Sequence, residues 1–421
     1  MKHTAEIIGV GTELLLGKVA NTDAKDLSQM LSEIGIDVFY HTVVGDNPQR
    51  LRNIVEIAKK RADIIITTGG LGPTCDDLTK QILAESFGKK LEYNEDAAAT
   101  MMDYFKNVIK AKSFTENNLR QAMLPEGCTV FHNKWGTAPG CAFEAEGVRV
   151  LMLPGPPREC VAMFRHCGMP YLTGLSEGEI VSHNLHVFGL GESAMEDKLH
   201  DMMENMKNPS VAPYAKEGEC FTRVTAKAAT AEEAEKLMEP VIAEIRERLG
   251  SVIYSTDIDS LERTVLTLIT EQGKTLATAE SCTGGLVSSR ITAIPGSSVA
   301  FLGGVATYSN ESKTILLGVD PKLIKEQGAV CRDVAIQMAS GVREKLGSDI
   351  GIGITGIAGP SSDGTDKAVG TVFVAMNAEG NVCCRDLHLG TERFRNRTAA
   401  ANHALDMVRR YLTGIEVENI R

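Results

Sequence analysis

The sequence predicts an α/β protein in which two parallel-sheet domains are joined by a smaller α+β domain. The first observation is the length of 421 residues, which at roughly 100 to 200 residues per domain corresponds to two to four domains. The second is that short apolar runs alternate with helical patterns at both ends of the chain, as is typical of a parallel sheet covered on both faces. The third is a middle stretch where this alternation changes. We therefore place the domains at residues 1–172, 173–255 and 256–421.

The elements of the first domain are predicted from its hydrophobic pattern. Short apolar runs indicate buried strands, and apolar positions that recur every three or four residues indicate amphipathic helices. The resulting strands are residues 6–10, 38–44, 63–67 and 149–153, and the helices are residues 23–34 and 51–60.

The middle domain is predicted to contain strands at residues 183–188 and 221–226 and helices at residues 193–206 and 231–249. In the second helix Met238, Ile242, Ile245 and Leu249 recur at helical spacing and indicate one buried face. In the last domain strands and helices alternate again, as in the first domain. Its predicted strands are residues 275–279, 303–308, 350–354 and 370–375, with a helix at residues 286–293.

Composition excludes several classes of protein. The hydrophobic share of 43% and the charged share of 24% are those of a globular chain. The net charge of −11, without a long basic run, argues against a general nucleic-acid binder. No apolar stretch approaches the roughly 18 residues of a membrane span, and the ten cysteines show no metal-ligand spacing. We expect a cytoplasmic protein with reduced thiols. The 40 glycines indicate many tight turns.

A glycine-rich turn between a buried strand and a helix is the densest motif of the first domain. It reads Thr-Thr-Gly-Gly-Leu-Gly-Pro-Thr-Cys-Asp-Asp-Leu-Thr over residues 67–79. Free backbone amides there favour a phosphate, with Gly69, Gly70, Gly72 and Thr74 as candidate contacts. Asp76 and Asp77 would repel a phosphate unless a divalent cation intervened. The alternative is that Asp76 caps the helix and Asp77 favours its dipole.

Other predicted strand ends supply further candidates. Glu13 follows the first strand in Gly-Val-Gly-Thr-Glu, and Asp46 follows the second. The carboxyl ends of parallel strands meet at one edge of a sheet, so both side chains should lie near the glycine turn. Gly155, in the Leu-Pro-Gly-Pro-Pro run of residues 153–157, marks a rigid turn before another helix and is a further candidate contact for the substrate.

These motifs resemble the N-terminal domain of the competence/damage-inducible protein A family, CinA. The resemblance rests on the Gly-Gly-Leu-Gly-Pro-Thr run, on residues 9–17 and on residues 153–157, and residues 136–140 also match. It implies the molybdopterin-binding fold and a metal-dependent pyrophosphatase that cleaves ADP-ribose to AMP and ribose 5-phosphate. The divalent cation would be Mg, Mn or Co, held by Asp76 and Glu13, and Asp46 or Asp77 would orient the attacking water.

In the last domain Ser281 stands at a strand-to-helix turn, in Ala-Glu-Ser-Cys-Thr-Gly-Gly. A serine there presents its hydroxyl at the sheet edge beside backbone amides, which suits a nucleophile. Tyr308 and Lys313 follow another strand, and no histidine is near, so a Ser-Lys pair is the simpler activation scheme. Burial would lower the pKa of Lys313 as that role requires. The alternative is that Ser281 caps a helix and Lys313 is solvated.

This region is similar to the CinA C-terminal domain, whose separate versions deamidate nicotinamide mononucleotide. The resemblance implies that Ser281 attacks the carboxamide with Lys313 as partner, while Tyr308 and Thr355 shape the pocket and Thr283 and Gly284 contact substrate. No cofactor is expected there. The substrate phosphate would be bound by Arg393, with Arg395 and Arg397 as alternatives because the Gly-x-Arg element has one extra residue.

The middle domain resembles the KH-like linking domain of the family, through residues 222–227 and 249–250. Its Gly189-Leu190-Gly191 lacks the basic surroundings of an RNA-clamping loop, so we expect spacing and homodimer formation rather than nucleic-acid or membrane binding. The leading hypothesis is a bifunctional hydrolase of ADP-ribose and nicotinamide mononucleotide. The alternatives are a molybdopterin-binding or adenylylating protein, and a non-catalytic adaptor contacting recombination or competence proteins.

Overall fold

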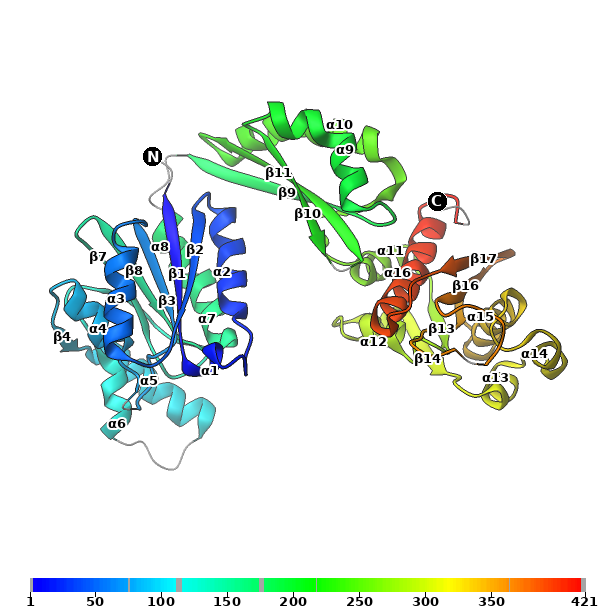
Figure 1. The fold of residues 1–421 in the computed structure, drawn as a ribbon, viewed down its shortest axis with the longest axis horizontal. Helices are drawn as coiled ribbons and strands as arrows, with labels where there is room; N and C mark the ends of the chain where they lie inside the picture. Colours follow the sequence, from blue (N-terminus) through cyan, green and yellow to red (C-terminus); the bar gives the residue numbers. More distant parts are fainter. Residues whose placement is uncertain are drawn as a thin grey trace. The chain divides into compact units, whose positions relative to one another are not determined.

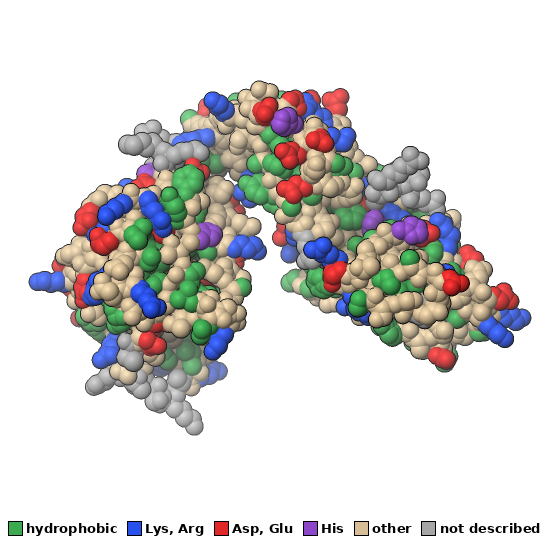
Figure 2. All heavy atoms as spheres, in the orientation of Figure 1, with side chains coloured by type: hydrophobic (Ala, Val, Ile, Leu, Met, Phe, Trp, Pro, Cys, Tyr) green, Lys and Arg blue, Asp and Glu red, His purple; other side chains and the backbone are tan. Residues whose placement is uncertain are grey.

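The computed structural model describes residues 3–74, 76–110, 116–173, 178–216, 218–362 and 364–417. The chain divides into two compact units, each described separately below. Unit 1 comprises Met1–Val181 and Lys227–Ala234, and unit 2 comprises Ser182–Ala226 and Glu235–Arg421. Acidic and basic side chains are interspersed on the visible surface of both units (Figure 2). No helix within the described ranges combines the length and apolar character needed to cross a membrane.

The main sheet of unit 1 has six strands in the order β2-β1-β3-β8-β7-β6. The strands β1, β2, β3 and β8 are parallel, whereas β7 and β6 are antiparallel to their neighbours. A separate hairpin pairs β4 with β5. The bounds are β1 Thr4–Val10, β2 Asp37–Val44, β3 Ile64–Thr68, β4 Leu91–Tyr93, β5 Met123–Pro125, β6 Thr129–Phe131, β7 Gly140–Ala145 and β8 Val148–Leu153.

Helices cover both faces of this sheet, as Figure 1 shows. On one face α2 and α7 pack on the apolar side chains of β1, β3 and β8, and on the other face α3, α4 and α5 do so. Asn21 and Asn47 cap α2 and α3 by accepting backbone hydrogen bonds. The helices are α1 Thr12–Leu15, α2 Thr22–Glu33, α3 Pro48–Ala58, α4 Thr79–Ser86, α5 Glu95–Tyr104, α6 Glu116–Leu119, α7 Pro157–Met163 and α8 Met169–Thr173.

The middle of the chain forms a four-stranded sheet in the order β10-β11-β9-β12, with antiparallel pairing of β10 with β11 and of β12 with β9. Two helices, α9 and α10, accompany it, as expected for the predicted small α+β domain. The bounds are β9 Glu179–Val187, α9 Glu192–Asn205, β10 Ser210–Lys216, β11 Glu219–Ala228, α10 Ala231–Leu249 and β12 Ile253–Thr256.

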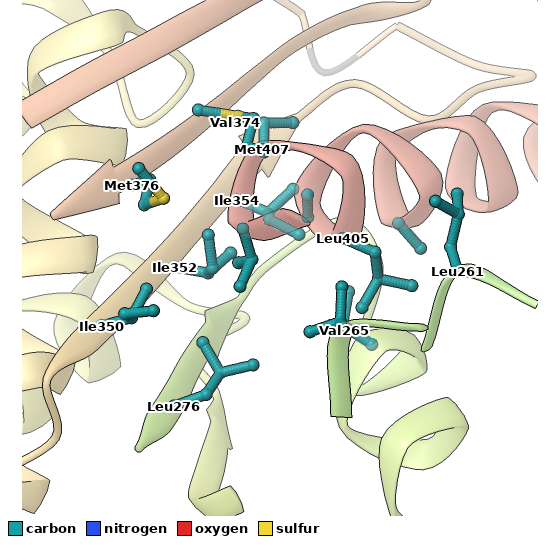
Figure 3. Packing of buried hydrophobic residues seen from close by; sticks show 14 of the residues in the cluster. Leu261, Val265, Leu276, Ile350, Ile352, Ile354, Val374, Met376, Leu405 and Met407 are labelled. Atoms are coloured by element: carbon teal, nitrogen blue, oxygen red, sulfur yellow. The ribbon is translucent and has the colours of Figure 1, made fainter. Parts of the chain in front are cut away.

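The second α/β sheet, in unit 2, has the order β14-β13-β15-β16-β17. The strands β14, β13 and β15 are parallel to one another, whereas β16 pairs antiparallel with both β15 and β17. On one face α11, α12 and α16 build the core drawn in Figure 3, and α15 covers the other face. The bounds are α11 Leu261–Glu271, β13 Leu276–Glu280, α12 Leu286–Thr292, β14 Phe301–Ala306, α13 Asn310–Leu317, α14 Pro321–Gln327, α15 Arg332–Leu346, β15 Ile350–Gly356, β16 Thr371–Ala378, β17 Asn381–His388 and α16 Arg393–Leu412.

The predicted α/β class is confirmed, but both α/β sheets are mixed rather than purely parallel. The reason is two short connections. Only Glu146 and Gly147 join β7 to β8, and only Glu379 and Gly380 join β16 to β17, and all four residues have positive φ. A two-residue turn of this kind permits only antiparallel pairing, since a parallel crossover needs a dozen residues or more.

Candidate functional site

Both α/β sheets reverse their strand order beside their first strand. In unit 1 the chain passes from β1 to β2 on one side and then to β3 on the other, and in unit 2 it passes from β13 to β14 and then to β15. Such a reversal opens a crevice at the carboxyl ends of the two central strands, where ligands of α/β proteins bind. The crevices therefore lie beside β1 and β3, and beside β13 and β15.

In unit 1 the turns that follow three strands touch one another at this edge. Gly69 has φ +96°, and a Cβ atom there would lie 2.2 Å from the carbonyl oxygen of Val10, at the end of β1. Its amide donates to the carbonyl of Leu153, the last residue of β8 (3.0 Å). A Cβ atom at Gly155 would lie 3.2 Å from the Cα of Gly69. Only glycine allows these backbones to approach so closely.

The glycine turn is closed from within by polar side chains. A Cβ atom at Gly70 would lie 2.1 Å from the Oγ1 of Thr79, and one at Gly72 would lie 2.5 Å from the Oδ2 of Asp77. The same Asp77 oxygen accepts hydrogen bonds from the amide (2.9 Å) and the hydroxyl of Thr74. Asp77 and Thr74 therefore hold the turn in this structure, a role that differs from the helix-dipole role given to Asp77 in the alternative.

The other predicted acidic residues lie at the same edge. Asp46 accepts hydrogen bonds from both the amide (2.9 Å) and the hydroxyl (2.8 Å) of Thr12, so it fixes the turn after β1. Glu13 packs its carboxylate against Gly11, where a Cβ atom would lie 2.5 Å from Oε1. Asp76 is fully exposed, and a hydrogen bond with the side chain of Thr74 lowers the pKa of its carboxyl. Cys75 lies outside the described residues.

The donors around the predicted metal site are few. Within the described residues, no three His, Cys, Asp or Glu side chains form a cluster that could hold a metal ion. A cage made of protein ligands alone is therefore not preformed in that part of the chain. Mg²⁺ commonly binds through one or two carboxylates together with substrate phosphates. An ionised, exposed Asp76 beside a glycine turn fits that second arrangement.

Sequence reasoning missed Lys80, which lies in the first turn of α4 directly after this motif. It is buried, and its Nζ donates to the carbonyls of Gln121 (2.7 Å) and Arg120 (3.3 Å). Burial lowers its pKa to about 8. Lys80 thus ties the glycine turn to the segment before β5. The only sequence signal for a buried Lys80 is that this lysine occupies an apolar position of the helical pattern.

In unit 2 Ser281 begins the turn after β13 and is almost buried. Its amide donates to the carbonyl of Ile354 on β15 (2.9 Å), which places it between the two central strands. The preceding Glu280 is fully buried, and its carboxylate accepts hydrogen bonds from the amides of Val287 (3.1 Å) and Ser288 (2.9 Å) at the start of α12. Glu280, rather than Ser281, therefore caps this helix.

Lys313 on α13 is brought to the serine. It is 1% exposed, and its Nζ lies 3.0 Å from the Oγ of Ser281 and 2.8 Å from the carbonyl oxygen of Thr307. Burial lowers the pKa of Lys313, and the nearby thiol of Cys282 opposes this only in part. Neither hydrogen-bond partner carries a charge. The structure therefore contradicts the alternative in which Lys313 is solvated.

A pocket of about 440 Å³ opens over this pair. Its wall includes Ser281, Lys313, Tyr308, Thr355 and Arg393. The Thr355 hydroxyl donates to the carbonyl of Ala329 (2.8 Å), and Arg393 donates to the carbonyl of Gly359 (2.9 Å) and to the Tyr308 hydroxyl (3.3 Å). Residues that sequence reasoning missed also line the pocket, among them Cys282, Asn310, Ser361, Ser362 and Thr365.

Thr283 and Gly284, which were predicted to contact substrate, are not among the residues that line this pocket. Thr283 is fully buried, and its carbonyl accepts a hydrogen bond from Arg397 (2.6 Å). Gly284 has φ +61°, and a Cβ atom there would lie 3.7 Å from the same guanidinium. Arg397 thus holds the serine turn, and Arg395 is exposed. Of the three candidate arginines, Arg393 lines the pocket.

Three protein families match consecutive parts of the chain. The family described as a probable molybdopterin binding domain matches residues 6–174, the damage-inducible protein CinA KH domain matches residues 182–255, and the CinA C-terminal domain matches residues 258–412.

Curated relatives match nearly the whole chain. A CinA-like protein of Dictyoglomus turgidum is 46% identical over 410 residues, 97% of this chain and 99% of the relative. A putative competence-damage inducible protein of Acetivibrio thermocellus is 45% identical over 408 residues, 97% of this chain and 98% of the relative. A solved structure of CinA with unknown function from Thermoplasma acidophilum is 32% identical, covers 41% of this chain and 99% of that chain, and has a TM-score of 0.37.

Proposed function

Because the chain belongs to the CinA family, we propose that it is a two-site hydrolase of pyridine-nucleotide metabolites. Unit 2 would hydrolyse the carboxamide of nicotinamide mononucleotide, and unit 1 would cleave the diphosphate of ADP-ribose. The observation that carries the first assignment is the buried Lys313–Ser281 pair, with 3.0 Å between Nζ and Oγ. The second is supported by the backbone-lined turn at the corresponding crevice of unit 1.

The buried pair supports a covalent amide hydrolysis. A lysine with a lowered pKa has an uncharged amine available, which can take the proton of Ser281 as Oγ attacks the carboxamide carbon. The lysine then returns that proton to the departing ammonia. A water molecule, deprotonated by the same amine, releases the carboxylate from the ester. The sum is one amide and one water converted to one carboxylate and one ammonium ion.

The pocket wall supports a substrate that carries a phosphate. Arg393 is a wall residue with a guanidinium that can bind phosphate oxygens in a bidentate manner. Ser361, Ser362 and Thr365 add hydroxyl donors on the same pocket. A pocket of about 440 Å³ is of the size that small-molecule ligands occupy.

Ammonia release from nicotinamide mononucleotide tests the first assignment. We expect Ser281→Ala and Lys313→Met to abolish it, because they remove the nucleophile and its proton acceptor. Lys322→Met is the matched control, since Lys322 is an exposed lysine on the neighbouring α14. Release by the wild type that Ser281→Ala leaves unchanged would contradict the assignment.

The proposal for unit 1 combines backbone amides with one carboxylate. The amides of the glycine turn would bind phosphate oxygens of ADP-ribose, and Asp76 would hold a divalent cation together with those oxygens. When bound, such a cation neutralises charge that develops on the diphosphate. Asp46 and Asp77 keep the turns at the carboxyl edge in place, and either carboxylate, with its second oxygen, can orient a water molecule.

Release of AMP from ADP-ribose tests this second assignment. We expect a chelator and Asp76→Asn each to suppress it while ammonia release continues. Asp103→Asn, at an exposed position on α5, is the control. Binding of molybdopterin without cleavage of ADP-ribose would favour the molybdopterin-binding alternative. Failure of both substrates, with partner binding that survives Asp76→Asn and Ser281→Ala, would favour the adaptor.

A further inference from the structure

The turn between β6 and β7 belongs to the carboxyl edge of the unit 1 sheet. Because β7 is antiparallel to β8, it begins where β8 ends, with Cys141 opposite Met152 and Phe131 of β6 opposite Gly140. Residues 132–139 therefore lie at the same edge as the glycine turns. A Cβ atom at Gly140 would lie 2.7 Å from the carbonyl oxygen of Met152, so this strand start is pressed onto β8.

One carboxylate lies beneath this turn. Glu159, on α7, accepts a hydrogen bond at Oε2 from the Nδ2 of Asn133 (2.6 Å). A Cβ atom at Gly136 would lie 1.9 Å from the same oxygen, so the backbone of Gly136 rests on the carboxylate. Asn133 is buried and also bonds the carbonyl of Ala138 (2.9 Å) and the amide of Trp135 (2.9 Å). Glu159 and Asn133 together define the path of the turn.

The contact is not explained by helix capping. Glu159 lies in the first turn of α7, where an acidic residue would favour the helix dipole. Its side chain nevertheless accepts a hydrogen bond from Asn133, 26 residues earlier. Burial raises the pKa of Glu159, against the opposing effects of Asn133 and Arg158. The hydrogen bond from Asn133 offsets part of the cost of keeping this partly buried carboxylate in place.

The same short segment also reaches the glycine turn. Gly155, four residues before Glu159, has its Cα beside Gly69, the residue whose amide bonds the end of β8. The segment from Gly155 to Glu159 is rigid, since it contains two consecutive prolines. The position of the turn at residues 132–139 is therefore linked to that of Gly69 through five residues.

We propose that Glu159 is a positioning residue of the unit 1 site: through Asn133 and Gly136 it holds the turn at residues 132–139 against the rigid segment beside Gly69, and so fixes one wall of the site for a nucleoside diphosphate group. This proposal rests on the proposed pyrophosphatase function. It assigns to Glu159 no contact with the reacting atoms.

Three variants separate positioning from catalysis. Glu159→Ala removes the acceptor, and Gly136→Ala forces the turn away from the carboxylate. Each is expected to raise the KM for ADP-ribose about tenfold with kcat changed less than about threefold, because a wall residue contributes equally to ground-state and transition-state binding. Glu159→Gln keeps an acceptor oxygen for Asn133 and should restore a KM near that of the wild type. Glu144→Ala, an exposed carboxylate on β7, is the control.

The chain contains its own reporter of the turn. Trp135 is the single tryptophan, its amide bonds the Oδ1 of Asn133, and its ring stacks on His166 with centroids 5.3 Å apart. We expect Glu159→Ala and Gly136→Ala to shift the tryptophan emission of the full-length protein, and Glu159→Gln to leave it unchanged. Titration with ADP, followed by this emission, gives a dissociation constant that does not depend on turnover.

The outcomes are distinct. Unchanged KM, ADP affinity and emission in both Glu159→Ala and Gly136→Ala would overturn the proposal. A fall in kcat at constant KM, equal in Glu159→Ala and Glu159→Gln, would also overturn it, because Glu159 would then act in the chemistry. If the wild type does not cleave ADP-ribose, the proposed function fails, and weakened ADP binding together with the emission shift still decides the role of Glu159. Circular dichroism and thermal unfolding of the full-length protein check that each variant is folded.

Discussion

The two α/β sheets place their candidate sites at the same topological position but equip them differently. Beside β13 and β15, two side chains, Ser281 and Lys313, meet within 3.0 Å in a buried setting. Beside β1 and β3, the site is lined by backbone. One carboxylate oxygen of Asp46 accepts hydrogen bonds from Thr12, and one of Asp77 accepts them from Thr74.

The difference shows what each site requires from its ligand. The serine–lysine pair is preorganised, since burial alone lowers the pKa of the lysine before any substrate binds. The glycine turn offers backbone amides and the exposed carboxylate of Asp76. Its charges are therefore neutralised only when a phosphate and a cation bind there. We expect substitutions in unit 2 to act on turnover and substitutions in unit 1 to act mainly on binding.

The largest effect, on ammonia release, should come from replacing Lys313 by arginine, which carries the same positive charge as a protonated lysine but does not lose its proton. Lys313→Arg places a guanidinium that stays protonated beside Ser281, so ammonia release should fall by about 1000-fold or more. In the wild type the rate should rise with pH through the lowered pKa of Lys313 and reach a plateau below the usual lysine value of 10.5. A pH–rate profile checks this, and a profile without that rise would contradict a lysine base.

The next effect concerns the stability of unit 2 rather than its chemistry. Asp406 is fully buried and accepts hydrogen bonds from Arg385 (2.9 Å), Arg409 (2.6 Å) and Arg410 (3.0 Å). Asp406→Ala leaves three buried guanidiniums without their anion and should cost about 3–5 kcal/mol of unfolding free energy. Thermal unfolding monitored with ammonia and AMP release should show loss of unit 2 alone. Asp386→Ala, at an exposed position on β17, is the control.

A smaller effect is expected when the backbone of the unit 1 site is changed. Gly69→Ala combines a positive φ with a Cβ atom 2.2 Å from the carbonyl oxygen of Val10. We expect a loss of about 2–3 kcal/mol and weaker ADP binding, because the strand ends must separate. Gly127→Ala has a similar φ of +67° but nothing within 4 Å, so it should cost only about 1 kcal/mol and leave binding intact. Equal effects of the two variants would contradict a specific role for Gly69.

The smallest effect is a pH dependence that should appear in unit 1. Burial raises the pKa of Asp23 on α2 to about 6, although a hydrogen bond with Cys160 opposes it. A raised carboxyl pKa means that the folded state holds the proton more tightly, so this stabilisation is complete at low pH and is lost as pH rises through 6. Asp23→Asn should therefore remove about 1 kcal/mol or more of the decline in unfolding free energy between pH 4 and 7. Denaturant unfolding of both proteins across this range checks it; parallel curves would contradict it.

Much of the fold was predictable because long apolar runs and helical periodicity mark their own elements. The strands around Ile7, Ile65 and Ile352 and the helices α2, α10 and α12 appear where the pattern indicates, within a few residues. The strands β4, β5 and β6 were missed because three residues are too few to show alternation. The hairpins β7–β8 and β16–β17 were missed too, because their only signal in the sequence is the short dipeptides Glu146-Gly147 and Glu379-Gly380.

The candidate sites were predictable to a different extent in the two units. Ser281 and Lys313 were found because each stands in a motif at a strand end, and strand ends meet at one edge. Asn133 and Glu159 were missed because their contact depends on the β6–β7 hairpin, which the sequence pattern did not indicate. The hydrogen bonds of Asp46 and Asp77 depend on local turn geometry, which a list of charged residues does not contain.

The two-residue turns at Glu146-Gly147 and Glu379-Gly380 bear on how the sheets assemble. Each sheet contains a hairpin of strands adjacent in sequence, β7–β8 or β16–β17, whereas β1 must pair with β3 across more than fifty residues. Contacts between neighbouring strands form sooner, because closing a long loop costs more entropy. We therefore expect pulsed hydrogen exchange to detect protection in β7–β8 and β16–β17 before β1 and β13, so that the strands bearing both candidate sites are the last to be fixed.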